Sequence, residues 1–214
     1  MDPGGLLVTY QNVRALAQRI TLGATDVFQD VPAATLCAWF LVDSVSAAVR
    51  VLSSVSTGAS SVNPRLEVAV NTATPRTTAR RLDADATTTL NAGAVTAATK
   101  HHLAAVAQFA SGTLSVYLDG VLSTTAVASW TGNTSNTLSL ASTIASTGLG
   151  TSVFDGRVTD VRQYQRALSE GEISTIVVAN GKDSNLFAGR SRWLCNELAP
   201  GATVVAAVDK WIAS

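Results

Sequence analysis

HHLAAVAQF (101–109), SVYLDGVL (115–122) and FDGRVTDVRQYQRALSEGEI (154–173) are the pieces of sequence that decide the fold of this chain. The middle piece overlaps a run, residues 114–118, in which apolar side chains alternate with polar or aromatic ones, as on a strand whose two faces differ. Asp119-Gly120 then separates this run from a second one. Asp-Gly suits a tight type I′ turn, because both central positions of that turn need a positive φ. The stretch therefore predicts a β-hairpin.

The third piece predicts a strand followed by a short helix. GRVTDVRQYQ (156–165) is expected to form a further strand. Ser169 stands three residues before Glu172, the spacing of a capping box, in which each side chain accepts a hydrogen bond from the other residue's backbone N–H. Asn180-Gly181 supplies a stop signal. We expect one helix near residues 170–179.

The first half of the chain adds strands of different kinds. TLCAWFLV (35–42) is an almost continuous apolar run, which predicts a central strand buried on both faces. RLEVAV (65–70) alternates and predicts a half-exposed strand. VRVLSSVS (49–56) and LSLAST (138–143) are further expected strands, and residues 83–99 are expected to form a loop and an edge strand.

Length and composition favour one all-β domain. The chain has 214 residues, of which 47% are hydrophobic and 14% are charged, enough for a substantial core. Its formal net charge is zero, so no overall field attracts nucleic acid or an anionic membrane, and association with neighbours is favoured over repulsion. The N-terminus lacks the features of a signal peptide, and no apolar run reaches the length of a membrane span. We therefore expect synthesis in a cytoplasm and no membrane insertion.

The order and spacing of these motifs resembles the laminin G-like group of concanavalin A-like jelly rolls. Members carry a His-His strand, a Tyr-apolar-Asp-Gly hairpin, and a Phe-x-Gly strand that runs into Arg-Ala-Leu-Ser and a helix. The matching positions are His101, His102, Ala104, Tyr117, Asp119, Gly120, Phe154, Gly156, Val158, Val161, Tyr164, Arg166, Ala167, Leu168, Ser169, Glu172 and Ile173. One departure is Lys100, where the family commonly has tryptophan.

The resemblance covers roughly residues 20–180 and implies an all-β fold, an antiparallel two-sheet jelly-roll sandwich with one short helix. We expect residues 1–19 to form an N-terminal arm or edge strand and 20–189 to form the sandwich. Residues 190–214 are expected to be a closing strand and tail of the same domain, paired near the N-terminal segment. Both terminal segments are expected to contact neighbouring subunits.

Paired catalytic carboxylates are missing from the sequence. Glycanases of this general fold use a Glu-x-Asp-x-x-Glu strand, and no such string occurs here. Glu67 stands alone, while Glu170 and Glu172 suit the positive end of a helix dipole. His101 and His102 are neighbours on a strand and so point to opposite faces, and one of them is expected to be a core residue that forms a structural hydrogen bond. We predict no catalytic residue and no enzyme activity.

Two groups of residues are candidates for binding. Arg76, Arg80 and Arg81 could grip phosphates, an acidic partner or an acidic glycan, and they could equally form a solvated face or the rim of an interface. Trp130 lies beside the TGNTSN loop, which includes Asn133, and an aromatic side chain in such a loop suits stacking on a sugar. Trp39, in contrast, is expected in the core.

No cofactor is predicted from the residues themselves. Relatives within the resembled group bind calcium in loops at the sandwich edge, and Asp26, Asp30 and Asp155 are loop carboxylates that could contribute to such a site. Cys37 and Cys195 are either two small buried side chains or a single disulfide bridge, and the sequence leaves both open.

The sequence leads to three functional hypotheses. The first is a non-catalytic structural protein on a bacteriophage virion, as a capsid decoration or tail-associated protein that forms homo-oligomers or contacts capsid or tail proteins. The second is a glycan-binding adhesin module that uses loops 57–64, 131–136 and 146–152 to reach cell-surface sugars. The third, a glycan-degrading enzyme, lacks its carboxylates.

Overall fold

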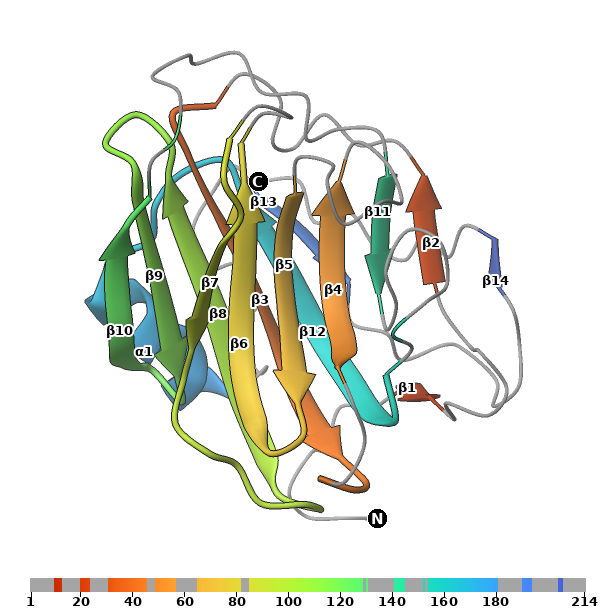
Figure 1. The fold of residues 1–214 in the computed structure, drawn as a ribbon. Helices are drawn as coiled ribbons and strands as arrows, with labels where there is room; N and C mark the ends of the chain where they lie inside the picture. The colour runs from red at the N-terminus through yellow and green to blue at the C-terminus, as the bar shows by residue number, and fades with distance from the viewer. Residues whose placement is uncertain are drawn as a thin grey trace.

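The computed structural model describes residues 10–12, 20–23, 31–45, 49–56, 65–81, 85–128, 130, 141–144, 152, 154–180, 190–193 and 204–205. Figure 1 shows two sheets packed face to face, with the helix α1 (Glu170–Ala179) beside the rear sheet. The predicted fold class, a jelly-roll sandwich with one short helix, is confirmed. No helix in these described ranges is long and apolar enough to cross a membrane.

Sheet A is the rear sheet in Figure 1 and is antiparallel throughout. Its strand order is β1 (Tyr10–Asn12), β12 (Gly156–Tyr164), β3 (Ala33–Val42), β8 (Lys100–Gln108), β9 (Thr113–Leu118) and β10 (Val121–Val127). β13 (Arg190–Trp193) also pairs with β12. Because β1 pairs with residues 156–158 and β13 with residues 161–164, the two segments share the edge of β12 that faces away from β3. The C-terminal segment thus extends sheet A beside the N-terminal one.

Sheet B is the front sheet in Figure 1. Its strand order is β14 (Val204–Val205), β2 (Ile20–Gly23), β11 (Ala141–Ile144), β4 (Arg50–Ser56), β5 (Arg65–Asn71), β6 (Thr74–Arg80) and β7 (Thr88–Asn91). Every pair is antiparallel except β14 with β2, which is parallel. The expected edge strand within residues 83–99 is β7, which ends this sheet.

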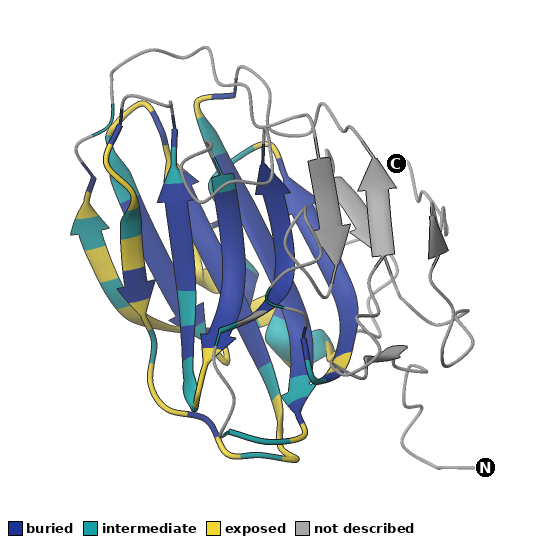
Figure 2. Ribbon diagram, turned by 45° about the vertical axis from the view of Figure 1, so that its right-hand side comes forward, coloured by how far each residue is buried: buried dark blue, intermediate teal, exposed yellow. Residues whose placement is uncertain are grey.

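The main core lies between the inner faces of the two sheets. Its buried side chains come from alternate positions of the strands, as period-two packing requires. They include Leu36, Ala38, Phe40, Val55, Leu66, Val68, Leu103, Ala105, Leu114, Val116, Val158 and Val161. Figure 2 shows the central strands buried along most of their length and the outer strand β10 largely exposed.

β3 is buried on both faces, as the sequence predicted. One set of its side chains enters the main core, and the other set, with Cys37, packs under α1 in a second cluster. That second cluster also holds Ala104, Val106, Tyr117, Tyr164, Leu168, Ile173 and Ile176. Sheet A therefore has apolar packing on both sides, with sheet B on one side and α1 on the other.

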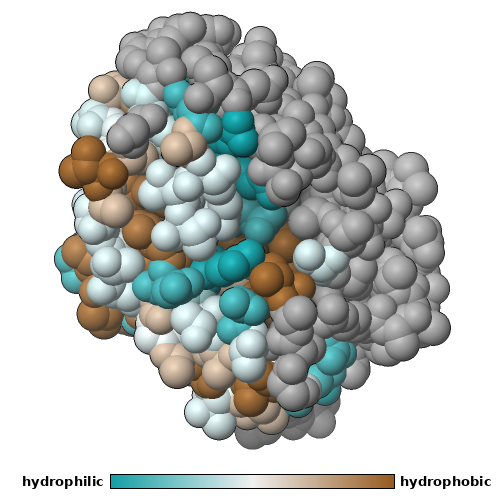
Figure 3. Space-filling view, in the orientation of Figure 1, coloured by the Kyte–Doolittle hydropathy of each residue, from teal (hydrophilic) through white to brown (hydrophobic). Residues whose placement is uncertain are grey.

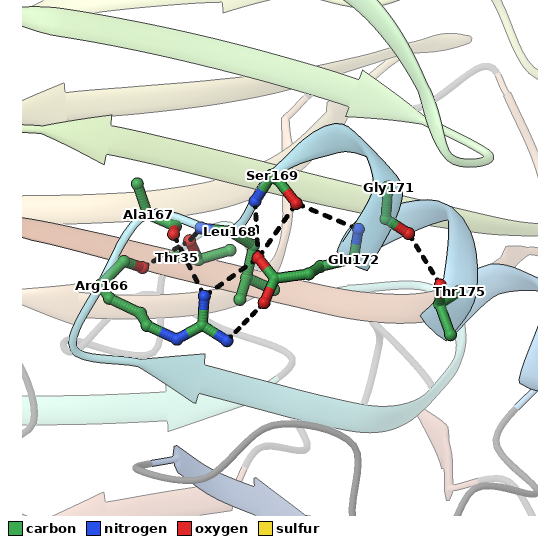
Figure 4. A network of polar contacts seen from close by, with 8 residues as sticks. All are labelled: Thr35, Arg166, Ala167, Leu168, Ser169, Gly171, Glu172 and Thr175. Atoms are coloured by element: carbon green, nitrogen blue, oxygen red, sulfur yellow. Dashed lines mark hydrogen bonds and ion pairs between the residues drawn. The ribbon is translucent and has the colours of Figure 1, made fainter.

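Polar contacts hold the start of α1 on β3 (Figure 4). Thr35 Oγ1 accepts a hydrogen bond from Leu168 N (3.0 Å) and donates one to the carbonyl of Arg166 (2.8 Å). The Arg166 guanidinium donates to both oxygens of Glu172, at 2.7 and 3.0 Å. Glu172 also accepts from Ser169 N (2.8 Å), so the predicted capping box is present and its glutamate has an additional arginine partner.

The predicted hairpin is confirmed. Asp119 and Gly120 both have positive φ, 52° and 85°, and the flanking strands pair as β9 and β10. The turn also contacts α1, since Ser174 Oγ donates to the carbonyl of Gly120 (3.3 Å). α1 thus spans from β3 to the far edge of sheet A.

The prediction that RLEVAV forms a half-exposed strand is wrong in its exposure. β5 forms, but Glu67 and Ala69 on its outer face are 3% and 1% exposed. β5 lies between β4 and β6, and Arg76 of β6 stands opposite Ala69. The structure therefore buries a face that the sequence pattern assigns to solvent.

Gly156, the glycine of the Phe-x-Gly motif, occupies a position that no other residue fits. Its φ is 140°, and a Cβ added there would lie 2.0 Å from the carbonyl oxygen of Leu41 and 3.0 Å from Val42 Cα. Both contacts are with the backbone of the adjacent strand β3, which cannot move aside without breaking the pairing. Glycine at this point lets β12 approach β3 closely.

We predict that Gly156→Ala lowers the free energy of unfolding by about 3 kcal/mol, because it combines a backbone clash with a strained φ. Gly171→Ala is the matched control, since a Cβ there meets nothing within 4 Å. Alanine is also the better helix former, so the control is expected to raise stability by roughly 0.5 kcal/mol. Urea unfolding of the two variants measures both effects, and equal stabilities would contradict the close-approach explanation.

Candidate functional site

The outer face of sheet B, the face turned away from sheet A, carries a cluster of charged and hydroxyl side chains. The register of β5 with β6 puts Arg80 opposite Arg65, Thr78 opposite Glu67 and Arg76 opposite Ala69. Glu67 therefore has arginines on the neighbouring positions of its own strand and of β6. Figure 3 shows this face, where hydrophilic side chains form a band among weakly polar ones.

Glu67 is buried in this cluster without a full set of partners. Arg65 Nη1 lies 3.9 Å from Glu67 Oε2, which is too long for a hydrogen bond, and Oε2 accepts no hydrogen bond from the residues that the structure describes. Burial raises the pKa of the Glu67 carboxyl, and this outweighs the lowering by the charges of Arg65 and Arg76. Glu67 Oε2 is thus a buried acceptor without a hydrogen bond from the described residues, and such a group lowers the free energy of unfolding.

Arg76 and the hydroxyls beside Glu67 complete the site. The Nε of Arg76 is also buried and donates no hydrogen bond. A row of side chains crosses four strands, from Ser54 on β4 through Glu67 and Thr78 to Thr89 on β7. The hydroxyls of Thr78 and Thr89 are 3.3 Å apart. We call Glu67, Arg76, Thr78, Thr89 and Arg80 the sheet-B polar face.

The predicted arginine cluster is divided between two faces. Arg76 and Arg80 are alternate residues of β6 and lie on the sheet-B polar face, whereas Arg81 follows directly and points inward. Arg81 is fully buried, with its guanidinium 5.0 Å from the centre of the Phe109 ring. Burial lowers the pKa of Arg81, and none of its three side-chain nitrogens donates a hydrogen bond. The structure therefore places two of the three predicted arginines on the same face and the third in the interior.

Trp130, the predicted stacking residue, packs against the same aromatic ring as Arg81. Its ring centre is 5.4 Å from that of Phe109, and it lies partly buried against the main core. Its Nε1 is buried and donates no hydrogen bond. Asn133 lies outside the described residues. A role for these two residues in binding stays a prediction.

The two histidines lie on opposite faces of β8, as predicted. His101 Nδ1 is 2.8 Å from Asp119 Oδ2, and its ring packs against Phe40. His102 packs against Trp39 on the other face, is fully buried, and forms no hydrogen bond through either ring nitrogen. The expected structural hydrogen bond is formed by His101, whose ring packs against Phe40 of the main core, whereas His102 is the fully buried histidine.

Trp39 is buried, as expected, and it explains the departure at Lys100. The ammonium of Lys100 lies 4.2 Å from the centre of the Trp39 ring and donates to Asn180 Oδ1 (2.6 Å) at the end of α1. The lysine thus links the tryptophan of β3 to the C-terminal cap of the helix. A cation over an aromatic face contributes roughly 0.5–2 kcal/mol.

The described residues contain no group of three His, Cys, Asp or Glu side chains that could hold a metal ion. Asp26 and Asp30, two of the three candidate calcium ligands, lie outside the described residues, as does Cys195. Asp155 is described, and its carbonyl accepts a hydrogen bond from Asp43 N (3.3 Å). Calcium binding and a Cys37–Cys195 bridge therefore stay predictions.

Comparison with known proteins identifies the family. A family model described as the concanavalin A-like lectin/glucanases superfamily matches residues 16–174. The chain belongs to this superfamily. The resemblance to laminin G-like jelly rolls is thereby confirmed. No curated protein sequence matches the chain.

Several solved structures share this superfamily fold. A native heptameric SAP-like pentraxin from Limulus polyphemus is 16% identical, with a TM-score of 0.56 over 84% of this chain and 90% of its own. The CBM40 of a Ruminococcus gnavus IT-sialidase, bound to α2,3-sialyllactose, is 17% identical, with a TM-score of 0.59 over 81% of this chain and all of its own. The binding domain of botulinum neurotoxin DC in complex with SialylT is 10% identical, with a TM-score of 0.51 over 70% of this chain and 36% of its own. At these identities the likeness is one of fold.

The burial of His102 can be tested through the pH dependence of stability. Burial lowers its pKa from 6.5 to about 4, an effect that the nearby charges of Asp160, Arg162, Asp119 and Lys100 modify. Between pH 6.5 and 4 the unfolded chain binds a proton at this histidine more readily than the folded chain does. The protein therefore keeps its full stability above pH 6.5 and loses part of it as the pH falls towards 4.

We predict that the free energy of unfolding falls by about 3 kcal/mol over this window. His102→Gln removes most of this pH dependence, whereas His101→Gln, at a partly exposed site, leaves it in place. Denaturant unfolding at a series of pH values measures the slopes, and a slope unchanged in His102→Gln would contradict the assignment.

Proposed function

We propose that this chain is a non-catalytic glycan-binding module that holds its ligand on the sheet-B polar face. The observation that carries the proposal is the pair of unsatisfied atoms there, Glu67 Oε2 and Arg76 Nε, beside a row of hydroxyls. Buried polar groups without partners cost about 1–3 kcal/mol each, so folded proteins seldom keep them without a reason. Each sugar hydroxyl both donates and accepts. A hydroxyl-rich ligand would first contact the exposed Thr89 and the partly exposed Arg76 and Arg80, and it would reach the two buried atoms once these side chains shift.

The charges on this face favour an acidic sugar. Arg65, Arg76 and Arg80 surround one carboxylate, Glu67, so positive charge is in excess. A guanidinium binds a carboxylate through two parallel hydrogen bonds, which makes it the side chain best suited to a sugar acid. Two structural neighbours support this choice, since their descriptions name sialyllactose and SialylT as bound partners.

The composition of the same face supports the proposed non-catalytic role. Cleavage of a glycosidic bond uses two carboxyl groups on either side of the bond. Among the described residues of β4 to β7, Glu67 is the single carboxylate.

Titration calorimetry with sialylated and desialylated forms of one oligosaccharide tests this function. We predict that the purified chain prefers the sialylated form, and that Arg76→Gln weakens its binding about tenfold or more, since a lost charged hydrogen bond costs at least about 1.4 kcal/mol. Arg157→Gln is the matched control, because Arg157 is an exposed arginine on β12 of the other sheet.

Three outcomes would contradict the proposal. Absence of binding on a broad glycan array would contradict glycan recognition as a whole. Equal binding of both oligosaccharides would contradict the acidic ligand. Loss of binding in Trp130→Ala together with full binding in Arg76→Gln would instead place the site at the loops that the sequence indicated.

A location on the surface of a bacteriophage particle is a separate proposal. It rests on the zero net charge and on the expectation of oligomers that contact capsid or tail proteins. Its test is stoichiometric binding of the purified chain to particle shells. A chain that binds glycans but ignores shells would leave the glycan-binding module as the function.

A further inference from the structure

The last strand of sheet A, β10, is unusually exposed and carries no charge. Its sequence, VLSTTAV, contains neither a charged residue nor proline. Val121, Leu122 and Val127 are 65%, 40% and 83% exposed, and they are three of the four large apolar side chains described as exposed. Edge strands are commonly protected by lysine, proline or a cover, since a bare edge pairs with other strands. β10 has neither of the first two, and among the described residues no segment covers its exposed side chains.

The backbone of β10 also offers unpaired groups. Ala128 N donates to the carbonyl of Gly112, which fixes the pattern of bonded and non-bonded pairs between β9 and β10. Hydrogen-bonded and non-hydrogen-bonded residue pairs alternate along an antiparallel ladder. Ala126, two residues before Ala128, therefore also forms hydrogen bonds with β9, while Thr125 and Val127 direct their backbone N–H and C=O groups away from β9. No described strand pairs with β10 on that side.

We propose that β10 pairs antiparallel with β10 of a second copy of this chain, so that sheet A continues across a homodimer. A partner strand would satisfy the outward backbone groups of Thr125 and Val127 and cover the exposed apolar side chains. This interface lies on sheet A and is independent of the proposed glycan site on sheet B.

A second copy suits this edge better than a different partner. An antiparallel pair of identical strands has twofold symmetry, so one surface serves both subunits. The strand carries no charge and the chain has a net charge of zero, so two copies meet without repulsion. The fourth exposed apolar residue, Val178 (84%), is on α1, which contacts the β9–β10 turn. β10 and α1, the two elements that carry these residues, lie at the same side of the molecule (Figure 1).

The structure also indicates the register. A bulge interrupts the β9–β10 pairing between Leu122 and Thr124, so the regular part of β10 begins at Thr124. A twofold axis at Ala126 uses only this regular part. It places Thr125 of one copy opposite Val127 of the other, with the outward backbone groups of both residues in one hydrogen-bonded pair.

Sedimentation analysis of the full chain and four variants tests the dimer and its register. We expect the unaltered chain to be a dimer. Thr125→Lys and Val127→Lys each weaken dimerisation at least tenfold, because each buries a charge in the interface. The double variant T125E/V127K restores the dimer, since the register puts each glutamate opposite a lysine of the other copy. Thr96→Lys is the control, because Thr96 is exposed in the β7–β8 connection.

Circular dichroism on every variant shows that loss of the dimer is not loss of the fold. A monomeric unaltered chain would overturn the proposal, as would a dimer that both single lysine variants leave intact. Disruption by the single lysines without recovery in T125E/V127K would overturn the register centred on Ala126. Since the glycan titration uses a different face, failure of either proposal leaves the other testable.

Discussion

β3 has apolar side chains on both of its faces, and a single layer of packing cannot bury both. The fold meets this constraint with two different covers. Sheet B covers the inner face of sheet A, and α1 covers the outer face, where Cys37 of β3 packs with Tyr164, Ile173 and Ile176. Each fully buried aliphatic side chain contributes roughly 1.5–3 kcal/mol, so removal of either cover would cost more than a typical domain can spare. The helix is therefore part of the core although it is short.

This arrangement decides which surfaces remain for binding. Sheet A packs against sheet B on one face and against α1 on part of the other, and among the described residues its edge at β10 is open. Sheet B has packing on one face, and its other face keeps Glu67, Arg76 and the threonines together. The two proposals follow this division. They place a ligand on the polar face of sheet B and a second copy at the edge of sheet A. A dimer of this kind would carry two ligand sites and could bind a multivalent glycan with higher avidity.

Prediction from the sequence succeeded where the signal was local. The turn at Asp119-Gly120 and the cap at Ser169 and Glu172 depend on neighbours within a few residues, and both have the expected geometry. It gave no prediction for residues 74–80, a strand with a proline and two arginines that lacks an apolar pattern. That segment becomes β6 because it pairs with β5 on one side and β7 on the other.

The candidate site shows the same limit. The sequence indicated that Arg76, Arg80 and Arg81 gather, but could not say that Arg81 turns inward to Phe109 while Arg76 comes to lie beside Glu67. Glu67 looked solitary because its neighbours on β6 are set by strand register rather than by spacing in the chain.

The sequence alone determined the period-two strands, the hairpin, the capped helix and, through the order of these motifs, the jelly-roll superfamily. These features depend on backbone conformation and on which residue types tolerate it. Only the tertiary structure decided that Glu67 is buried with an unsatisfied oxygen, that His102 rather than His101 is fully buried, and that β10 is left bare. Burial and hydrogen-bond satisfaction depend on neighbours from distant parts of the chain, and no local pattern specifies those neighbours.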